Sequence, residues 1–112
     1  MQRGELWWAT LPEPKGSEPR YRSPVLIVSS NRFNESRINT VVVAAIASNI
    51  RLGNAPGNIQ LPAKGSGLTK ASIVNVSQLA TLDKTFLTKR IGRLTRSQLE
   101  CVDEGLRLVL GL

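Results

Sequence analysis

The sequence contains no histidine and only one cysteine among its 112 residues. A metal site built from histidine and cysteine ligands is therefore excluded. A catalytic triad that uses histidine and a Cys–His dyad are excluded for the same reason. One cysteine also leaves no partner for an intramolecular disulfide bond. Cys101 falls among residues with helical spacing, so we expect it to be a small packed side chain.

Acidic residues are scarce as well, because eight Asp and Glu stand against fifteen Lys and Arg, for a net charge of +7 at pH 7. The acids form no carboxylate-rich motif of the kind that holds magnesium, so we expect neither a metal nor a cofactor. The positive charge indicates a polyanionic partner, most simply nucleic acid, with solubility as the alternative interpretation. Residues 61–99 carry seven Lys and Arg against Asp83 alone, which places the basic surface away from the C-terminal helix.

Long hydrophobic runs are also missing. No segment reaches the roughly 18 apolar residues of a membrane span. The first residues, MQRGELWW, lack the apolar run of a signal peptide. We therefore expect a cytoplasmic protein without a membrane partner, and residues 1–112 are long enough for one domain with a modest core.

Short strands account for most of the remaining pattern. The run TVVVAAIA at 40–47 is continuous rather than alternating, so we expect it to be buried on both faces. Residues 72–78 alternate, which places Asn75 and Ser77 on one face. Trp7 and Trp8 point to opposite faces: either both cover hydrophobic surface, or one is core and the other faces a groove. The candidate strands are 3–10, 25–30, 40–47, 58–61, 72–78 and 88–94.

The clearest element is a C-terminal helix. Thr95 and Gln98 have the spacing of a capping box, and the helix should end near Gly111. Short turns are expected at 31–36, with Asn31 as N-cap, and at 84–87, capped by Asp83. These elements predict an α+β domain with a small, strongly bent antiparallel sheet or barrel. The apolar stripe of the helix consists of Leu99, Val102, Leu106, Val109 and Leu110.

The stretch GSEPRYRSPVLIVSSN at 16–31 is the main candidate for a functional segment. It begins as a polar loop and passes through Ser23-Pro24 into a strand, and Pro24 favours an extended conformation there. Charged side chains are thus held on a loop anchored in a rigid scaffold, as in many binding sites. A surface hairpin loop solubilised by its charges is the alternative interpretation.

A metal-free reaction at RNA phosphate suits this set of residues. RNA supplies its own nucleophile, the 2′-hydroxyl, and the protein need only position it, accept its proton and stabilise charge on phosphorus. Glu18 could accept the proton, and Arg20 or Arg22 could hold the phosphate through a planar bidentate contact.

Motifs along nearly the whole chain resemble those of the MazF/PemK (Kid) toxins from bacterial toxin–antitoxin pairs. No single motif is diagnostic, but their order and spacing over about a hundred residues are those of the family. The matching segments are RGELWW at 3–8, KGSE at 15–18, PVLIV at 24–28, residues 31–34 and 41–49, SQ at 77–78 with TLDK at 81–84, and IGRL at 91–94 before the final helix.

The resemblance implies a small SH3-like barrel with a C-terminal helix, acting as a homodimer. It implies a sequence-specific endoribonuclease that cleaves single-stranded RNA (mRNA, rRNA or tRNA) to a 2′,3′-cyclic phosphate and a 5′-hydroxyl. It also implies a cognate antitoxin whose disordered acidic C-terminal tail folds across the basic RNA groove. The net charge fits RNA and such a tail equally well.

Two positions depart from the family pattern. An arginine usually stands immediately before the proline of the second strand, where this chain has Ser23, with Arg22 one residue earlier. A threonine usually ends the third strand, where this chain has Ala47, followed by Ser48. Three interpretations stay open: an active enzyme with a rearranged site, a weakened homologue that still binds RNA and antitoxin, and a deliberately detoxified variant.

The resulting assignment has Glu18 as base, Arg22 as phosphate clamp and Ser48 as a supporting hydroxyl. A non-catalytic module that binds RNA or antitoxin and a gyrase-poisoning toxin are the competing classes. The residues expected to contact RNA are Arg20, Tyr21, Ser23, Asn49, Asn75, Ser77 and Gln78.

Overall fold

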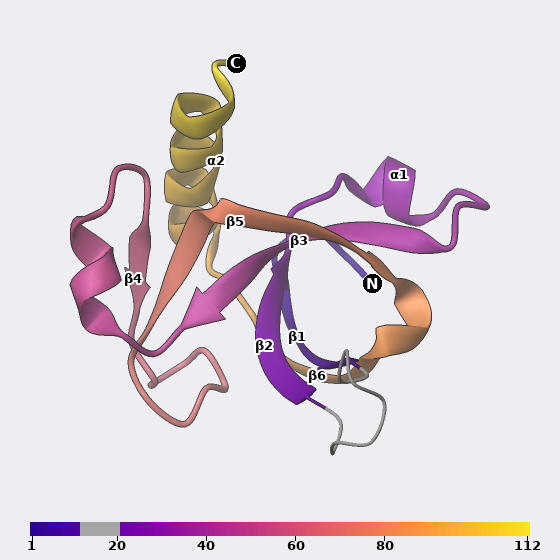
Figure 1. Cartoon of the computed structure of the whole chain (residues 1–112), viewed down its shortest axis with the longest axis horizontal. Helices are drawn as coiled ribbons and strands as arrows, with labels where there is room; N and C mark the ends of the chain where they lie inside the picture. The colour runs from indigo at the N-terminus through magenta and orange to yellow at the C-terminus, as the bar shows by residue number, and fades with distance from the viewer. Residues whose placement is uncertain (12–20) are drawn as a thin grey trace.

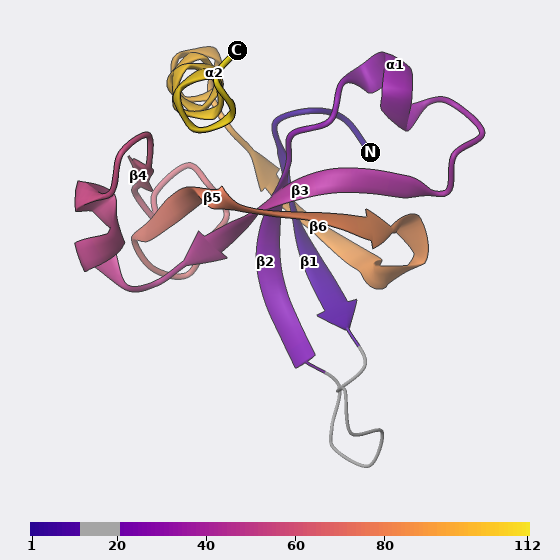
Figure 2. The ribbon, with the colours of Figure 1, turned by 45° about the horizontal axis from the view of Figure 1, so that its top comes forward.

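A single antiparallel sheet forms the body of the molecule in the computed structural model, which describes residues 1–11 and 21–112. The strand order in this part of the chain is β4-β5-β3-β2-β1-β6. The sheet curls strongly, and a C-terminal helix stands beside its β4–β5 end (Figures 1 and 2). The predicted α+β class with a bent sheet is confirmed. The strands are β1 (Glu5–Leu11), β2 (Tyr21–Ile27), β3 (Thr40–Ala47), β4 (Ile59–Leu61), β5 (Ser72–Asp83) and β6 (Leu87–Arg93).

Three short helical turns and one long helix complete the described part of the chain. The helix α1 is a single turn, and Ser30 rather than Asn31 is its N-cap, accepting a hydrogen bond from the Phe33 amide. The turn after β5 is capped by Asp83, as predicted, and Thr85 hydrogen bonds lower the pKa of that carboxyl. The helical elements are α1 (Asn31–Asn34), the 3₁₀ turns η1 (Ile50–Asn54) and η2 (Lys84–Phe86), and α2 (Arg96–Leu110).

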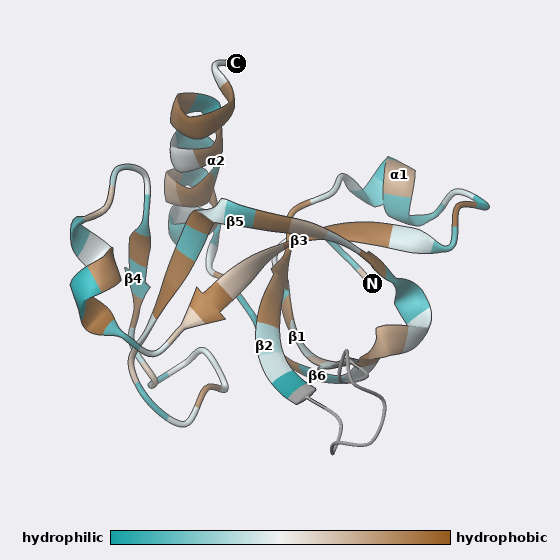
Figure 3. Cartoon of the chain, viewed as in Figure 1, coloured by the Kyte–Doolittle hydropathy of each residue, from teal (hydrophilic) through white to brown (hydrophobic). Residues whose placement is uncertain are grey.

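Two apolar clusters lie on opposite sides of the central strands. Leu26 belongs to one cluster, while its neighbours Val25 and Ile27 belong to the other, as alternation along a strand requires. The prediction that residues 40–47 are buried on both faces is confirmed only in part. Buried residues alternate with half-buried ones, and the buried side changes between Val43, in the second cluster, and Ala44, in the helix-side cluster. Figure 3 shows β3 hydrophobic over most of its length. The helix-side cluster consists of Leu6, Leu26, Ala44, Ile46, Leu61, Leu68, Val74, Val76, Leu94, Val102 and Leu106. The second cluster consists of Ala9, Val25, Ile27, Val41, Val43 and Leu87.

The bend of the sheet is concentrated in β5. Its pairing with β3 jumps from Ala44 opposite Leu79 to Ala45 opposite Asn75, so residues 76–78 of β5 have no partner on β3. Such a bulge bends a strand and increases its twist. The predicted strand 72–78 therefore continues to Asp83, and its first residues pair with both β3 and β4.

The second strand begins at Tyr21, earlier than the predicted 25–30, and runs through Pro24. β1 pairs with it over 21–26, whereas β3 pairs with it only over 25–27. Pro24 thus lies on a locally free edge, where a missing amide breaks no ladder. This free edge is where the sheet opens towards the candidate site.

The C-terminal helix packs against the helix-side cluster with residues of its first three turns. Its predicted capping box is confirmed: the Gln98 amide donates to Thr95 Oγ1 (3.1 Å), and the Thr95 amide donates to Gln98 Oε1 (2.9 Å). Leu99, Val102 and Leu106 pack on the helix-side cluster. The prediction that Cys101 is packed is wrong, because its position on the helix faces away from that stripe and its side chain is exposed.

The first residues of the chain are tied to distant elements. Arg3 Nη2 donates to Asp103 Oδ1 of α2 at 2.6 Å, and Arg3 Nε donates to the Val28 carbonyl. Glu5 is buried and pairs with Arg90 of β6 at 3.1 Å. Burial raises the pKa of the Glu5 carboxyl, but hydrogen bonds from Gln2 and Trp7 and the Arg90 charge outweigh it, so the pKa lies below its ordinary value. These contacts join β1 to both the helix and the edge strand.

Two glycines bring α2 against the turn that precedes β4. Gly57 adopts a φ of +82°, and a Cβ added at Gly105 would overlap the Gly57 carbonyl oxygen. The backbones therefore touch at a distance that no other residue pair permits. Among the described residues of α2, Gly105 is buried in the middle of the helix.

We expect Gly105→Ala to lower the free energy of unfolding by about 1–3 kcal/mol, the usual range for overpacking. The higher helix propensity of alanine alone would raise that free energy by about 1 kcal/mol. The sign of the measured change therefore shows whether overpacking or helix propensity dominates. Urea denaturation measures it. Glu104→Ala, at the adjacent exposed position, is the control and should stay within about 0.5 kcal/mol of the parent. A stabilised Gly105→Ala protein would contradict the contact.

In the described part of the chain, neither helix combines the length and the apolar character needed to cross a bilayer.

Candidate functional site

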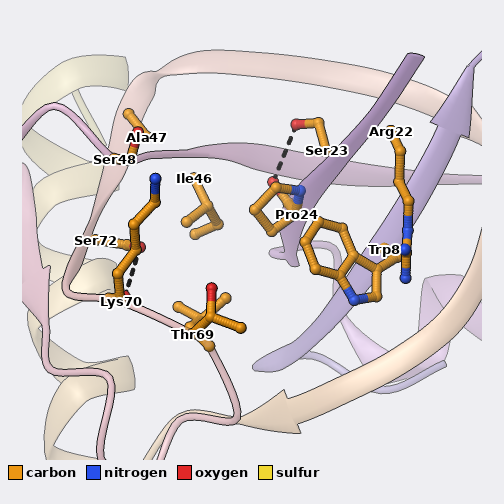
Figure 4. Close-up of a pocket in the computed structure, with 11 residues that line it drawn as sticks. Trp8, Arg22, Ser23, Pro24, Ile46, Ala47, Ser48, Thr69, Lys70 and Ser72 are labelled. Carbon is orange, nitrogen blue, oxygen red and sulfur yellow. Dashed lines mark hydrogen bonds between the residues drawn. The ribbon is translucent and has the colours of Figure 1, made fainter.

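A hollow of about 290 Å³ opens beside the free edge of β2, facing the end of β3 and the loop of residues 62–71 (Figure 4). Ile46 and Leu68 are buried members of the helix-side cluster, so the apolar part of the hollow belongs to the core. Polar and charged side chains surround this apolar part. The lining residues are Trp8, Arg22, Ser23, Pro24, Ile46, Ala47, Ser48, Leu68, Thr69, Lys70 and Ser72.

One wall of the hollow is a stacked pair of side chains. The Arg22 guanidinium carbon lies 4.2 Å from the centroid of the Trp8 ring, within the range of a cation–π interaction. The two residues come from neighbouring strands that pair Thr10 with Arg22 and Trp8 with Pro24. The stacking holds the guanidinium at the rim, and no hydrogen bond within residues 1–11 and 21–112 uses its donors.

Charge in the hollow has one sign among the described residues. Arg22 and Lys70 line it, and no lining residue is acidic. The other polar groups are the hydroxyls of Ser23, Ser48 and Thr69, together with the buried Ser72. An anionic group of a few atoms fits this combination of two cations and several hydrogen-bond donors.

A second, shallower groove of about 550 Å³ adjoins the hollow at Ser23, which lines both. Its walls are apolar side chains of β2, β3 and β5, with the exposed Ser77 and Gln78 at the β5 bulge. The groove therefore offers flat apolar surface with a few polar groups at one end. It is lined by Ser23, Val25, Val43, Ala45, Ser77, Gln78, Leu79, Ala80 and Leu82.

Comparison with known proteins assigns the chain to a family. A profile described as PemK-like, MazF-like toxin of type II toxin–antitoxin systems matches residues 2–110. The chain belongs to this family. The family resemblance predicted from the sequence motifs is thus confirmed.

The MazF-like chain is similar to named endoribonucleases over its full length. It is 46% identical over 112 residues to endoribonuclease MazF6 of Mycobacterium tuberculosis strain H37Rv, covering 100% of this chain and 98% of the relative. It is 33% identical over 115 residues to endoribonuclease EndoA of Bacillus subtilis strain 168, covering 100% and 96%. Among solved structures, an endoribonuclease in complex with its cognate antitoxin from a mycobacterial species superposes with a TM-score of 0.80 at 26% identity, covering 100% and 96%.

Four of the positions singled out in the sequence meet in the hollow of this MazF-like chain. All four line it: Arg22 and Ser23 from β2, Ala47 from the end of β3, and Ser48 directly after it, although β2 and β3 are not paired at this point. Within the described residues, the one hydrogen bond of Ser23 Oγ is a long contact, 3.5 Å, to the Pro24 carbonyl oxygen. Glu18 and Arg20 lie outside the described residues, as does the side chain of Tyr21.

Asn49 and Asn75 lie outside both cavities and make hydrogen bonds within the chain. Asn49 caps η1 and accepts a hydrogen bond from the Arg51 amide at 3.1 Å. Asn75 is buried; its amide donates to Gln78 Oε1 (3.1 Å) and its carbonyl accepts from the Ser77 hydroxyl (3.0 Å). Asn58 completes the group, accepting from the Val76 amide at 3.0 Å. Asn58 and Asn75 thus hold the β5 bulge in shape, whereas Asn49 caps η1.

Sequence reasoning missed the contribution of Trp8 and of the loop before β5. Of the two alternatives for the tryptophans, the one with one ring in the core and the other facing a groove is correct. Trp7 packs against the second cluster, and Trp8 lines the hollow. For Thr69 and Lys70 there was no local signal, because the position of the loop depends on contacts with β6, far along the chain, and on the burial of Leu68 in the core.

We expect Asn75→Ala to lower the free energy of unfolding by about 1–3 kcal/mol, because it leaves buried polar groups of the β5 bulge without partners. Gln78→Ala removes one hydrogen bond from an exposed side chain and should change that free energy by about 0.5 kcal/mol or less. Thermal and urea unfolding at one fixed protein concentration measure both variants. A loss of about 0.5 kcal/mol or less in Asn75→Ala would show that the Asn75 network does not stabilise the bulge.

Proposed function

We propose that this chain is the toxin of a toxin–antitoxin pair and a sequence-specific endoribonuclease that cleaves single-stranded RNA without a metal ion. The observation that carries the proposal is the hollow, in which Arg22, Lys70 and several hydroxyls face a space free of acidic lining residues in the described part of the chain. Full-length similarity to MazF6 and EndoA, both named endoribonucleases, supports it.

The reaction uses the RNA's own 2′-hydroxyl. Its oxygen attacks the adjacent phosphorus while Glu18, which lies between β1 and β2 in the sequence, accepts the proton. The new P–O2′ bond closes a 2′,3′-cyclic phosphate as the P–O5′ bond breaks, and the 5′-oxygen leaves as a hydroxyl after taking a proton from solvent. Arg22 contacts the non-bridging oxygens through its planar fork, and the Ser48 hydroxyl donates to the same phosphate.

Recognition of bases would take place in the adjoining groove. Ser77 and Gln78 are its exposed polar groups, and the groove meets the hollow at Ser23. Arg20 and Tyr21 are assigned to RNA binding from the sequence. Asn49 and Asn75 contribute by shaping the surface, because their hydrogen bonds go to other residues of the chain.

The proposed partners, RNA and an antitoxin, are inferred from the net charge and from similarity to a toxin–antitoxin complex. A net charge of +7 attracts RNA and an acidic disordered peptide alike. A structural relative was solved with its cognate antitoxin. We therefore include in the proposal a cognate antitoxin with an acidic tail, a homodimeric toxin, and a cytoplasmic location, where mRNA, rRNA and tRNA are present.

A second candidate function, binding without cleavage, is favoured by two positions in the hollow. The Ala47 methyl offers no hydrogen bond, and Ser23 carries no charge, where the family pattern has threonine and arginine. Binding of RNA and antitoxin could persist on the same surface after the loss of these groups. Two experiments separate the candidates.

Cleavage of a long unstructured RNA in EDTA tests the enzyme and its residues. We expect cuts at one short motif, with 5′-hydroxyl ends that a polynucleotide kinase labels without prior phosphatase treatment.

Glu18→Gln should slow cleavage by about 10²–10⁴-fold, the usual contribution of a general base. Arg22→Met should slow it by about 10²–10³-fold. Arg96→Met and Glu100→Gln on α2 are matched controls and should cut at the parental rate. Cleavage that requires Mg²⁺ would overturn the mechanism.

Restoring the family residues tests the second candidate. We expect the double variant Ser23→Arg with Ala47→Thr to cleave the same motif at least as fast as the parent, because it adds a guanidinium and a hydroxyl to the hollow. The measurement is the single-turnover rate on the same RNA. Cleavage by the double variant alone would assign the parent to the binding-only class. Cleavage by neither protein would refute the nuclease proposal.

A further inference from the structure

The wall of the hollow opposite Arg22 is formed by a lysine from the loop before β5. Lys70 lines the hollow, and Figure 4 shows its side chain extending past Ser72 towards Ser48, while Arg22 and Trp8 lie on the other side. The two cations therefore bracket the hollow from different elements of the fold. The proposed mechanism gives a role to Arg22 and none to Lys70.

The charge of Lys70 is not matched by an acid in the described part of the chain. The ion pairs found there involve Arg3, Arg90 and Arg96. The polar groups that share the hollow with Lys70 are hydroxyls, and Ser72 Oγ donates to the Lys70 carbonyl oxygen at 3.1 Å. An ammonium group placed among hydroxyls at the edge of a polar cavity attracts an anion from outside the protein.

The loop that carries Lys70 is anchored on its N-terminal side by backbone contact with β6. Gly67 has a φ of +87°, and a Cβ there would overlap the Ile91 carbonyl oxygen. A Cβ at Gly92 would likewise overlap the Ser66 carbonyl oxygen. Ser66 is itself buried, and its hydroxyl accepts a hydrogen bond from the Leu68 amide at 3.1 Å. The Ser66–Gly67 segment is thus fixed against the edge strand.

Burial anchors the same loop next to Lys70 on both sides. Leu68 packs in the helix-side cluster, and Ser72 is a buried residue at the start of β5. Only Thr69, Lys70 and Ala71 between them are exposed. The Lys70 backbone is therefore held in place before any ligand arrives, which lowers the entropy lost when its side chain orders on binding.

We infer that Lys70 binds the scissile phosphodiester of the RNA from the side opposite Arg22, an inference that rests on the proposed function. Its ammonium is a compact point charge that suits a non-bridging phosphate oxygen, complementing the planar contact of Arg22. The negative charge that develops on phosphorus during attack is then stabilised by cations on two sides. Ser48 and Thr69 supply hydroxyl donors between them.

The test uses Lys70→Met with Lys64→Met as its matched control. Lys64 lies in the same loop, is exposed, and does not line the hollow. Cleavage is measured on the long RNA in EDTA. Binding is measured by fluorescence anisotropy with a random-sequence 2′-O-methyl RNA, which lacks the nucleophile and cannot be cut, at several KCl concentrations.

Lys70→Met should slow cleavage by about 10²–10³-fold. It should also reduce the slope of log K against log salt by about 0.7, the value for one phosphate contact on a single strand. Lys70→Arg, which keeps the charge, should restore the slope and part of the rate. Lys64→Met should keep both the parental rate and the parental slope.

The outcomes distinguish this inference from the proposed nuclease. If the parent cleaves RNA and Lys70→Met behaves like Lys64→Met, Lys70 is a solvated surface residue and the inference is overturned. If the parent binds RNA without cleaving it and Lys70→Met alone loses a phosphate contact, the phosphate site stands and the nuclease proposal fails. If the parent neither binds nor cleaves, both are overturned.

Discussion

The bend in β5 is the constraint on which the arrangement of the molecule depends. One strand of twelve residues pairs with β3 along most of its length and with β4 at its start, and three of its residues, 76–78, leave the β3 ladder between the two stretches of pairing. At the bulge, Asn58 Oδ1 accepts a hydrogen bond from the Val76 amide, and the buried Asn75 amide bonds to the side chains of Ser77 and Gln78. The bulge thereby separates the part of β5 that faces α2 from the part that faces the second cluster, and it leaves Ser77 and Gln78 at the surface beside β2.

Two cavities on the same sheet result from this arrangement, and they differ in character. The hollow is small, positively charged and edged with hydroxyls, whereas the adjoining groove is wider and largely apolar. A nucleic acid strand presents the same alternation, with a charged phosphate next to a flat base. The meeting of the two cavities at Ser23 lets one strand place a phosphate in one and a base in the other.

Much of the fold could be predicted from local patterns. The capping box at Thr95, the strand at 40–47 and the cap at Asp83 are each encoded by a few neighbouring residues. The start of β2 was predicted four residues too late, because Pro24 indicates a break unless β3 is known to stop pairing with β2 at Val25. Cys101 was placed in the core because its helical face depends on how α2 is rotated against the sheet, which the cysteine itself does not determine.

The candidate site could be predicted only where its residues lie on elements with a clear local pattern. Arg22, Ser23 and Ser48 were found because they flank strands. The buried role of Asn75 is set by a bulge that strict alternation does not reveal. The approach of Lys70 depends on contacts between residues 66–67 and 91–92, which join segments distant in the sequence and involve mostly backbone atoms.

The paired contact between the 66–67 and 91–92 segments restricts how the chain can change in length. No atom beyond its own neighbours lies within 4 Å of a Cβ added at Gly65, so residues inserted before Ser66 would extend into solvent. An insertion or deletion between Gly67 and Ser72 would instead pull Leu68 from the core or shift the register of β5. Length variation in this loop is therefore tolerated only on its N-terminal side, away from the hollow.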